Sequence, residues 1–187
     1  MNRLFCLETE WTQSKHDLKD KSTVLSLLTF LDDAIGDFSY VFRQVATLDD
    51  FEFYIRHLEY PSYDSYDVVY LCFHGEPGVI QFADRSEYSL NDFAIKHKSI
   101  FDGRTVIFDC CSTLKLNDDK VLDFKKLTGA KTVIGYRKKV DFIKSFVFEF
   151  WLLNALKVYP NYGSKRIFAL AEKEMPVYAK SLGFVCY

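Results

Sequence analysis

Three short runs of apolar, mostly β-branched or aromatic residues constrain this chain most. They are DVVYLCF at 67–73, RTVIFD at 104–109 and KTVIGY at 131–136. Continuous apolar runs of this length are typical of strands that are buried on both faces, as in parallel sheets. Segments with helical spacing of apolar residues separate these runs. The alternation therefore predicts an α/β fold with a central, mainly parallel sheet.

The remaining elements follow from local signals. Arg3–Trp11 and Phe38–Ala46 have the composition of two earlier strands, and Val79–Ala83 follows a Gly-Glu-Pro-Gly turn as a small hairpin-like segment. The polar stretch at 12–21 predicts an exposed loop. Caps, stops and periodicity predict helices at these places: 24–35 with Ser22 or Thr23 as cap, 48–60 capped by Thr47, a short one from Asn91, 120–127 stopped by Gly129, a long amphipathic one from Asp141 to near Pro160, and a last one from near Ser164.

The size of the chain indicates one domain over residues 1–187. A single domain commonly takes about 100 to 200 residues, and the chain has 187. Aromatic residues make up 17% of the sequence, so we expect a large core that needs neither disulfides nor a metal for stability.

Charge and cysteine usage exclude several classes of protein. The net charge of -2 argues against a direct nucleic-acid binder. The most apolar stretch, 146–156, contains Glu149 and Asn154, so we expect no membrane span, and the N-terminus is too acidic for a signal peptide. The five cysteines, two of them adjacent, suit free thiols and a cytoplasmic location. No CxxC or HxxxH pair is present, so we expect no metal and no cofactor.

Polar residues with chemical potential follow two of the predicted strands. DVVYLCF ends in His74-Gly75, and RTVIFD ends in Cys110-Cys111-Ser112. In parallel sheets such positions lie at the edge where ligands bind, so a thiol and an imidazole can meet there. The N–H groups of Gly75 and of the cysteine could hold an oxyanion, and Gly75 lets a substrate carbonyl approach. The alternative is structural, because buried cysteines are common core residues and a histidine after a strand is often structural.

At these residues the chain resembles the caspase-like cysteine peptidases, which include caspases, metacaspases, gingipains and CHAT domains. YLCFHGEPG is similar to the strand before their His-Gly, and TVIFDCCS is similar to the metacaspase strand that ends in Asp-x-Cys. LTGAKTVIGYRKKVDF is similar to a later CHAT segment. The resemblance covers about residues 67–156 and implies a three-layer α/β/α fold in a small, stand-alone bacterial member.

The resemblance also implies roles for individual residues. Cys111 is the nucleophile, His74 is the general base, and the N–H groups of Gly75 and Cys111 form the oxyanion hole. The chain departs from the pattern after the nucleophile, where Ser112-Thr113-Leu114 contains no glycine. The function implied is a cysteine endopeptidase (a thiol protease, hence a hydrolase), and the alternative is an inactive caspase-like module that binds or scaffolds other proteins.

Acidic residues near the site indicate the substrate. In the members that this chain resembles, the residue at Asp109 lines the pocket for the residue before the cleaved bond (P1) and favours Arg or Lys there. Asp141 and Glu76 are further candidates for substrate binding. The alternative for Asp109 is that it caps the next turn.

We expect no inhibitory prodomain within these 187 residues, and unregulated proteolysis would be toxic. We therefore expect control by a partner protein, by self-association or by a small signalling molecule, with a protein or peptide as substrate. Stand-alone bacterial relatives suggest a stress or antiviral (anti-phage) defence role. A flavodoxin-like or receiver-like domain is a poorer match, because the chain lacks a Gly-rich phosphate loop and a suitable acidic cluster.

Overall fold

A computed structural model describes residues 3–11 and 23–187, so the loop predicted at 12–21 and the cap at Ser22 lie outside the described residues. The strands are β1 (Arg3–Thr9), β2 (Ser39–Val45), β3 (Tyr66–Glu76), β4 (Val79–Gln81), β5 (Glu87–Ser89), β6 (Thr105–Cys110), β7 (Thr132–Tyr136) and β8 (Phe184–Cys186). The helices are α1 (Leu25–Ile35), α2 (Leu48–Ile55), the 3₁₀ turns η1 (Arg56–Glu59) and η2 (Pro61–Tyr63), α3 (Leu90–Lys96), α4 (Asp118–Thr128), α5 (Phe142–Val158), α6 (Ser164–Glu174) and α7 (Pro176–Leu182).

The strands form one sheet in the order β2-β1-β3-β6-β7-β8, and β4 and β5 extend the end of β3 as a hairpin. The pairs from β2 to β7 are parallel, and only β8 runs antiparallel to its neighbour β7 within that order. The prediction of a mainly parallel sheet is confirmed. Parallel pairing places the carboxyl ends of β1, β3, β6 and β7 along one edge of the sheet.

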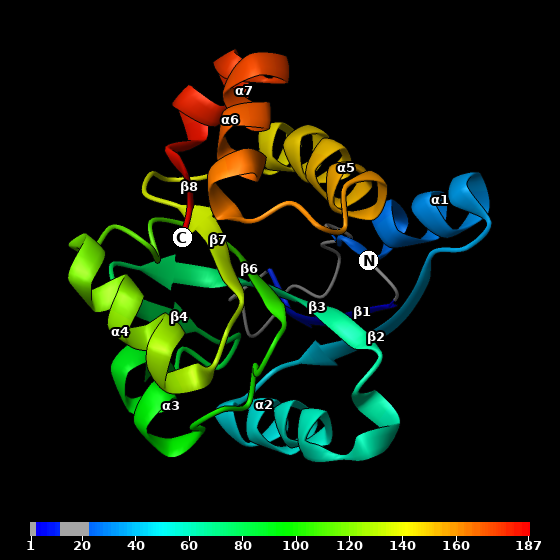
Figure 1. The fold of residues 1–187 in the computed structure, drawn as a ribbon. Coiled ribbons are helices and arrows are strands. Elements are labelled where there is room, and N and C mark those ends of the chain that lie inside the picture. Colours follow the sequence, from blue (N-terminus) through cyan, green and yellow to red (C-terminus); the bar gives the residue numbers. More distant parts are fainter. Residues whose placement is uncertain (1–2, 12–22) are drawn as a thin grey trace.

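Helices cover both faces of this sheet (Figure 1). One face carries α2, α3 and α4, and the other carries α1, α5, α6 and α7. Side chains alternate between these faces along each strand, so Leu71 and Phe73 belong to the first core and Tyr70 and Cys72 to the second. The three-layer α/β/α arrangement is therefore confirmed.

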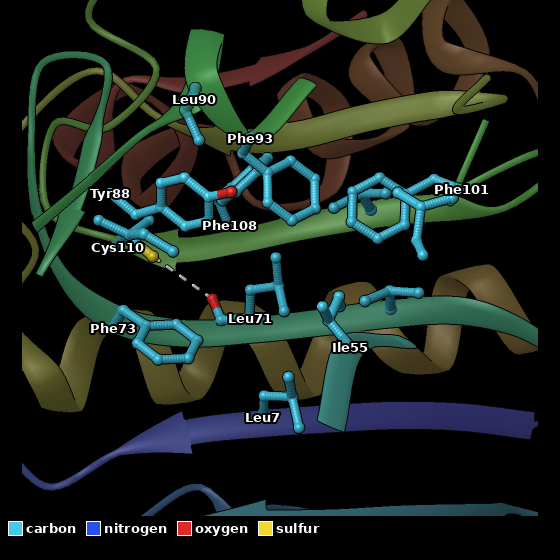
Figure 2. Packing of buried hydrophobic residues seen from close by; sticks show 14 of the residues in the cluster. Leu7, Ile55, Leu71, Phe73, Tyr88, Leu90, Phe93, Phe101, Phe108 and Cys110 are labelled. Carbon is cyan, nitrogen blue, oxygen red and sulfur yellow. Dashed lines mark hydrogen bonds between the residues drawn. The ribbon is translucent and has the colours of Figure 1, made fainter. Parts of the chain in front are cut away.

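The core on the α2, α3 and α4 face is rich in aromatic rings. Phe51 makes edge-on or tilted contacts with Phe73, Phe82, Tyr88 and Phe93, at centroid distances of 5.5 to 6.2 Å. Figure 2 shows part of this cluster, together with the Cys110 thiol, which donates to the carbonyl of Leu71 at 3.4 Å. The large aromatic core expected from composition is present.

Two features of the C-terminal part differ from the predictions. The last helix is followed by α7 and by the edge strand β8, whose three residues are too few to give an alternating pattern. Helix α5 begins directly after Asp141 as predicted, but it is not amphipathic. Ile143, Val147 and Phe150 are exposed on its outer side, while Phe148 and Leu152 are buried on its inner side.

In the part of the chain that the structure describes, no helix combines the length and the apolar run that crossing a bilayer requires.

Candidate active site

His74 and Cys111 lie side by side at the carboxyl edge of the sheet. Strands β3 and β6 are paired as far as Phe73 and Cys110. The next residues are His74, still on β3, and Cys111, the first residue after β6. Neighbouring strands are about 5 Å apart. The strand alternation places both side chains on the face of the sheet that carries α1 and α5. The two residues that the sequence singled out are therefore brought together.

The His74 ring is oriented by Trp11. Its Nε2 lies 3.0 Å from the main-chain carbonyl of Trp11, and the indole ring meets the imidazole edge-on at 5.4 Å. A carbonyl oxygen only accepts, so Nε2 carries the hydrogen and Nδ1 is the nitrogen of the neutral ring that can take a proton.

Glu8 in turn holds Trp11 in place. This buried carboxylate accepts hydrogen bonds from Trp11 Nε1 at 2.7 Å, Thr23 Oγ1 at 2.5 Å and the Val24 amide at 2.8 Å. It thereby ties the end of β1 to the beginning of α1. Sequence reasoning missed Glu8, although a carboxylate at a core position of a strand was the available signal.

Cys111 is the half-buried thiol of this edge. The Val140 amide donates to its Sγ at 3.3 Å, and Sγ lies 3.8 Å from the Val140 carbonyl. An N–H pointing at sulfur stabilises a thiolate. Among the described residues no hydrogen bond joins His74 to Cys111; each is held by another segment.

The remaining thiols are poor nucleophiles. Burial raises the pKa of Cys6, raises that of Cys72 and Cys110 much further, and raises that of Cys186 to about 12. A protonated thiol is unreactive at neutral pH. Cys6, Cys72 and Cys110 pack in the cores, as the sequence suggested for Cys6 and Cys72.

Gly75 is required by the turn that follows Cys111. A Cβ on Gly75 would overlap Thr113 Oγ1 and would come within 2.6 Å of the Cys111 carbonyl oxygen. The chain's own turn therefore occupies the space that we expected to admit a substrate carbonyl. Ser112 adopts a φ of 55°, so this turn takes a glycine-like conformation without a glycine.

Asp109 lies two residues before Cys111 on the same face of β6, with 5% of its surface exposed. Its carboxylate accepts a hydrogen bond from the Tyr70 hydroxyl at 3.1 Å, so it does not take the alternative role of capping the next turn. Burial raises the pKa of Asp109 to about 7.

Asp141 and Glu76 lie apart from this carboxylate. Asp141 is exposed and caps α5, with its Oδ1 accepting from the Lys144 amide at 3.0 Å. Glu76 is exposed at the end of β3, opposite Val79 in the hairpin. The structure gives Asp141 a structural role and gives Glu76 no contact with Asp109.

A pocket of about 400 Å³ opens on the other face of the sheet, between α3 and α4. Gly78, Leu90, Leu116 and Phe124 are among its lining residues, whereas His74 and Cys111 are not. Within residues 3–11 and 23–187, no group of His, Cys, Asp or Glu side chains is arranged to hold a metal ion.

Comparison with known proteins gives a family and no activity. No curated protein matches the sequence. A family model matches residues 1–185, almost the whole chain, and its description is "Family of unknown function (DUF6642)". The chain therefore belongs to the DUF6642 family.

Proposed function

We propose that the protein is a cysteine endopeptidase, acting in the cytoplasm, in which Cys111 is the nucleophile and His74 transfers protons. One observation carries the proposal. The two side chains occupy adjacent positions on one face of neighbouring strands, and the Trp11 carbonyl keeps the hydrogen on Nε2 of His74. That tautomer leaves Nδ1 to receive the thiol proton.

The proposed reaction has two steps. His74 Nδ1 takes the proton of Cys111, and the thiolate attacks the scissile carbonyl. The N–H groups of Gly75 and Cys111 hold the oxyanion once the turn after Cys111 has moved away from Gly75. The imidazolium then protonates the leaving amine, and an acyl-enzyme remains. Nδ1 next removes a proton from water, the resulting hydroxide attacks the thioester, and the acid product leaves as the thiol is restored.

The proposed substrate is a protein or peptide with Arg or Lys before the cleaved bond. Asp109 supports this preference, because a buried carboxylate close to the nucleophile pairs well with a cationic side chain.

Control of the enzyme from outside belongs to the same proposal. His74 is bonded to Trp11 and Cys111 to Val140, so activation by a partner protein, by self-association or by a small ligand would exchange these contacts for a His74–Cys111 hydrogen bond. A role in stress or phage defence fits such a latent enzyme. The same two contacts favour the second candidate, an inactive module that binds other proteins.

Covalent labelling tests the proposal. An Arg-chloromethyl ketone is incubated with wild type, Cys111→Ala, His74→Ala and the control Cys186→Ser, and intact mass is followed over time. We expect single labelling of wild type and of Cys186→Ser, because the irreversible reagent traps each molecule whenever its dyad assembles, and none within the same time for the other two variants. Equal labelling of all four proteins would reject the dyad and favour the inactive module.

A further inference from the structure

Three buried carboxylates lie beneath the dyad, on the face of the sheet that carries α1 and α5. Glu8 on β1, Cys72 on β3 and Asp109 on β6 are in register across the sheet. This row lies two residues, about 7 Å, inward from His74 and Cys111. Glu149 reaches the same layer from the buried side of α5.

Glu149 differs from the other two carboxylates in the hydrogen bonds that it accepts. Glu8 accepts three hydrogen bonds, and Asp109 accepts one from Tyr70. Glu149 is fully buried; its Oε1 accepts from the Tyr136 hydroxyl, while Oε2 has no partner among the described residues. A buried carboxylate oxygen without a partner costs free energy and marks a place where a donor fits.

Glu149 and Asp109 are close enough to influence one another. Gly135 on β7 pairs with Phe108 on β6. The next residues, Tyr136 and Asp109, therefore lie opposite one another on neighbouring strands. The negative charge of Asp109 adds to burial in raising the pKa of Glu149 well above its usual range. Two carboxylates in one buried layer repel one another, and a cation between them would remove the repulsion.

No cation of the protein meets this need within the described chain. The ion pairs formed there involve Asp37, Glu52, Asp64 and Asp118, and none involves Asp109 or Glu149. The raised pKa values mean that a proton is retained on the pair, and a cationic group could take the place of that proton.

We propose that Glu149 is a second specificity-determining residue, so that the P1 side chain of the substrate enters between Asp109 and Glu149 and bonds to Glu149 Oε2. The inference rests on the proposed peptidase function. A guanidinium has donors along two edges and can serve two carboxylates at once, whereas an ammonium is a point charge. The pair therefore selects Arg over Lys. Access requires Val140 to move from Cys111 Sγ, which is the contact that activation breaks.

The test compares charged and neutral P1 groups of equal shape. Peptidyl acyloxymethyl ketones with P1 Arg, Lys, citrulline and norleucine are reacted with wild type, Glu149→Gln, Glu149→Met and the control Glu172→Gln, an exposed residue on α6. The readout is the second-order rate of Cys111 modification. Gln and Met match the size of Glu and mimic a neutral side chain, so both variants should fold, which thermal unfolding checks.

The expected result is selective. The rate of Cys111 modification by the P1 Arg ketone falls about 10- to 100-fold in both variants, because one charge-assisted hydrogen bond is lost. The rates with the citrulline and norleucine ketones stay within about threefold of wild type. The control keeps the wild-type Arg-to-citrulline ratio. An Arg rate that is unchanged in both folded variants would overturn the role of Glu149 and leave the dyad standing. Wild type in which none of the ketones modifies Cys111, even on prolonged incubation, would overturn the dyad and this inference together.

Discussion

The two faces of the sheet are built from the same strands but contain different chemistry. The face under α2, α3 and α4 holds stacked and edge-on rings, with the Cys110 thiol bonded to a main-chain carbonyl (Figure 2). The face under α1 and α5 holds Glu8, Asp109 and Glu149, together with the buried hydroxyls of Tyr70 and Tyr136. Buried carboxylates are costly, and a protein that needs only stability fills such positions with apolar residues.

One face is therefore a hydrophobic core alone, whereas the other combines a hydrophobic core with the candidate site. Alternate residues of β3 and β6 serve the two purposes, so a single strand contributes Phe73 to one core and His74 to the dyad. Substitutions on the first face should accordingly change stability alone, whereas substitutions of the polar residues on the second face should also change reactivity or pH response.

The largest expected effect is on the aromatic face. Phe51→Ala removes a fully buried ring that contacts four others, so the free energy of unfolding should fall by about 3 to 5 kcal/mol. Denaturant unfolding measures this loss. The control Phe30→Ala changes a ring that is 57% exposed on α1 and should cost less than about 1 kcal/mol. Preference among P1 groups should not change in folded Phe51→Ala; a changed preference would contradict the division between the faces.

The next effect concerns the support of His74. In Glu8→Gln the amide nitrogen cannot accept, so some of the hydrogen bonds from Trp11, Thr23 and Val24 are lost, and the free energy of unfolding should fall by about 1 to 3 kcal/mol. The rate of Cys111 labelling should fall as well, because Trp11 orients the imidazole. Glu10→Gln, two residues along and exposed, is the control. Unchanged labelling by folded Glu8→Gln would show that Trp11 does not depend on this carboxylate.

A third effect is a pH dependence with a defined sign. The pKa of Asp109 is raised to about 7 from an unfolded value near 4, so the folded state binds more protons between those pH values. The stability contributed by this group is complete below about pH 4 and is lost as the pH rises to about 7. The melting temperature of Asp109→Asn relative to wild type should therefore increase from pH 4 to pH 7.

Asp37 and Asp118 have lowered pKa values, so they change the stability with pH in the opposite direction. Because wild type and variant share these groups, comparing the two at each pH isolates the contribution of Asp109. The exposed Asp123→Asn is the control for the same substitution outside the buried layer. A difference for Asp109→Asn that stays flat with pH would mean that the folded protein holds Asp109 ionised.

Patterns of neighbouring residues predicted much of the fold. They could not predict the contacts of the site, because those contacts join residues that are far apart in the sequence. The strand predicted at 67–73, the Thr47 cap and the start of a helix at Asp141 rest on neighbouring residues, and each prediction was confirmed. The Glu8–Trp11–His74 arrangement joins two strands through a side chain and a carbonyl, and no sequence spacing encodes it. Glu149 was noticed only as an interruption of an apolar stretch, because its partner Tyr136 lies on another element.

The smallest effect tests the turn where the chain departs from the caspase-like pattern. Ser112 holds a φ of 55°, a conformation that costs a non-glycine residue about 1 kcal/mol. Ser112→Gly removes this cost from the folded state. Glycine also raises the conformational entropy of the unfolded chain, which offsets part of the gain, so the free energy of unfolding should rise by about 0.5 kcal/mol. Ser99→Gly, at a φ of 61° in a turn before β6, is a matched control with the same expected gain.

Labelling of Cys111 should be retained in both variants, because the turn keeps its backbone path. Slower labelling in Ser112→Gly alone would show that the serine side chain takes part in the site and does more than complete a turn.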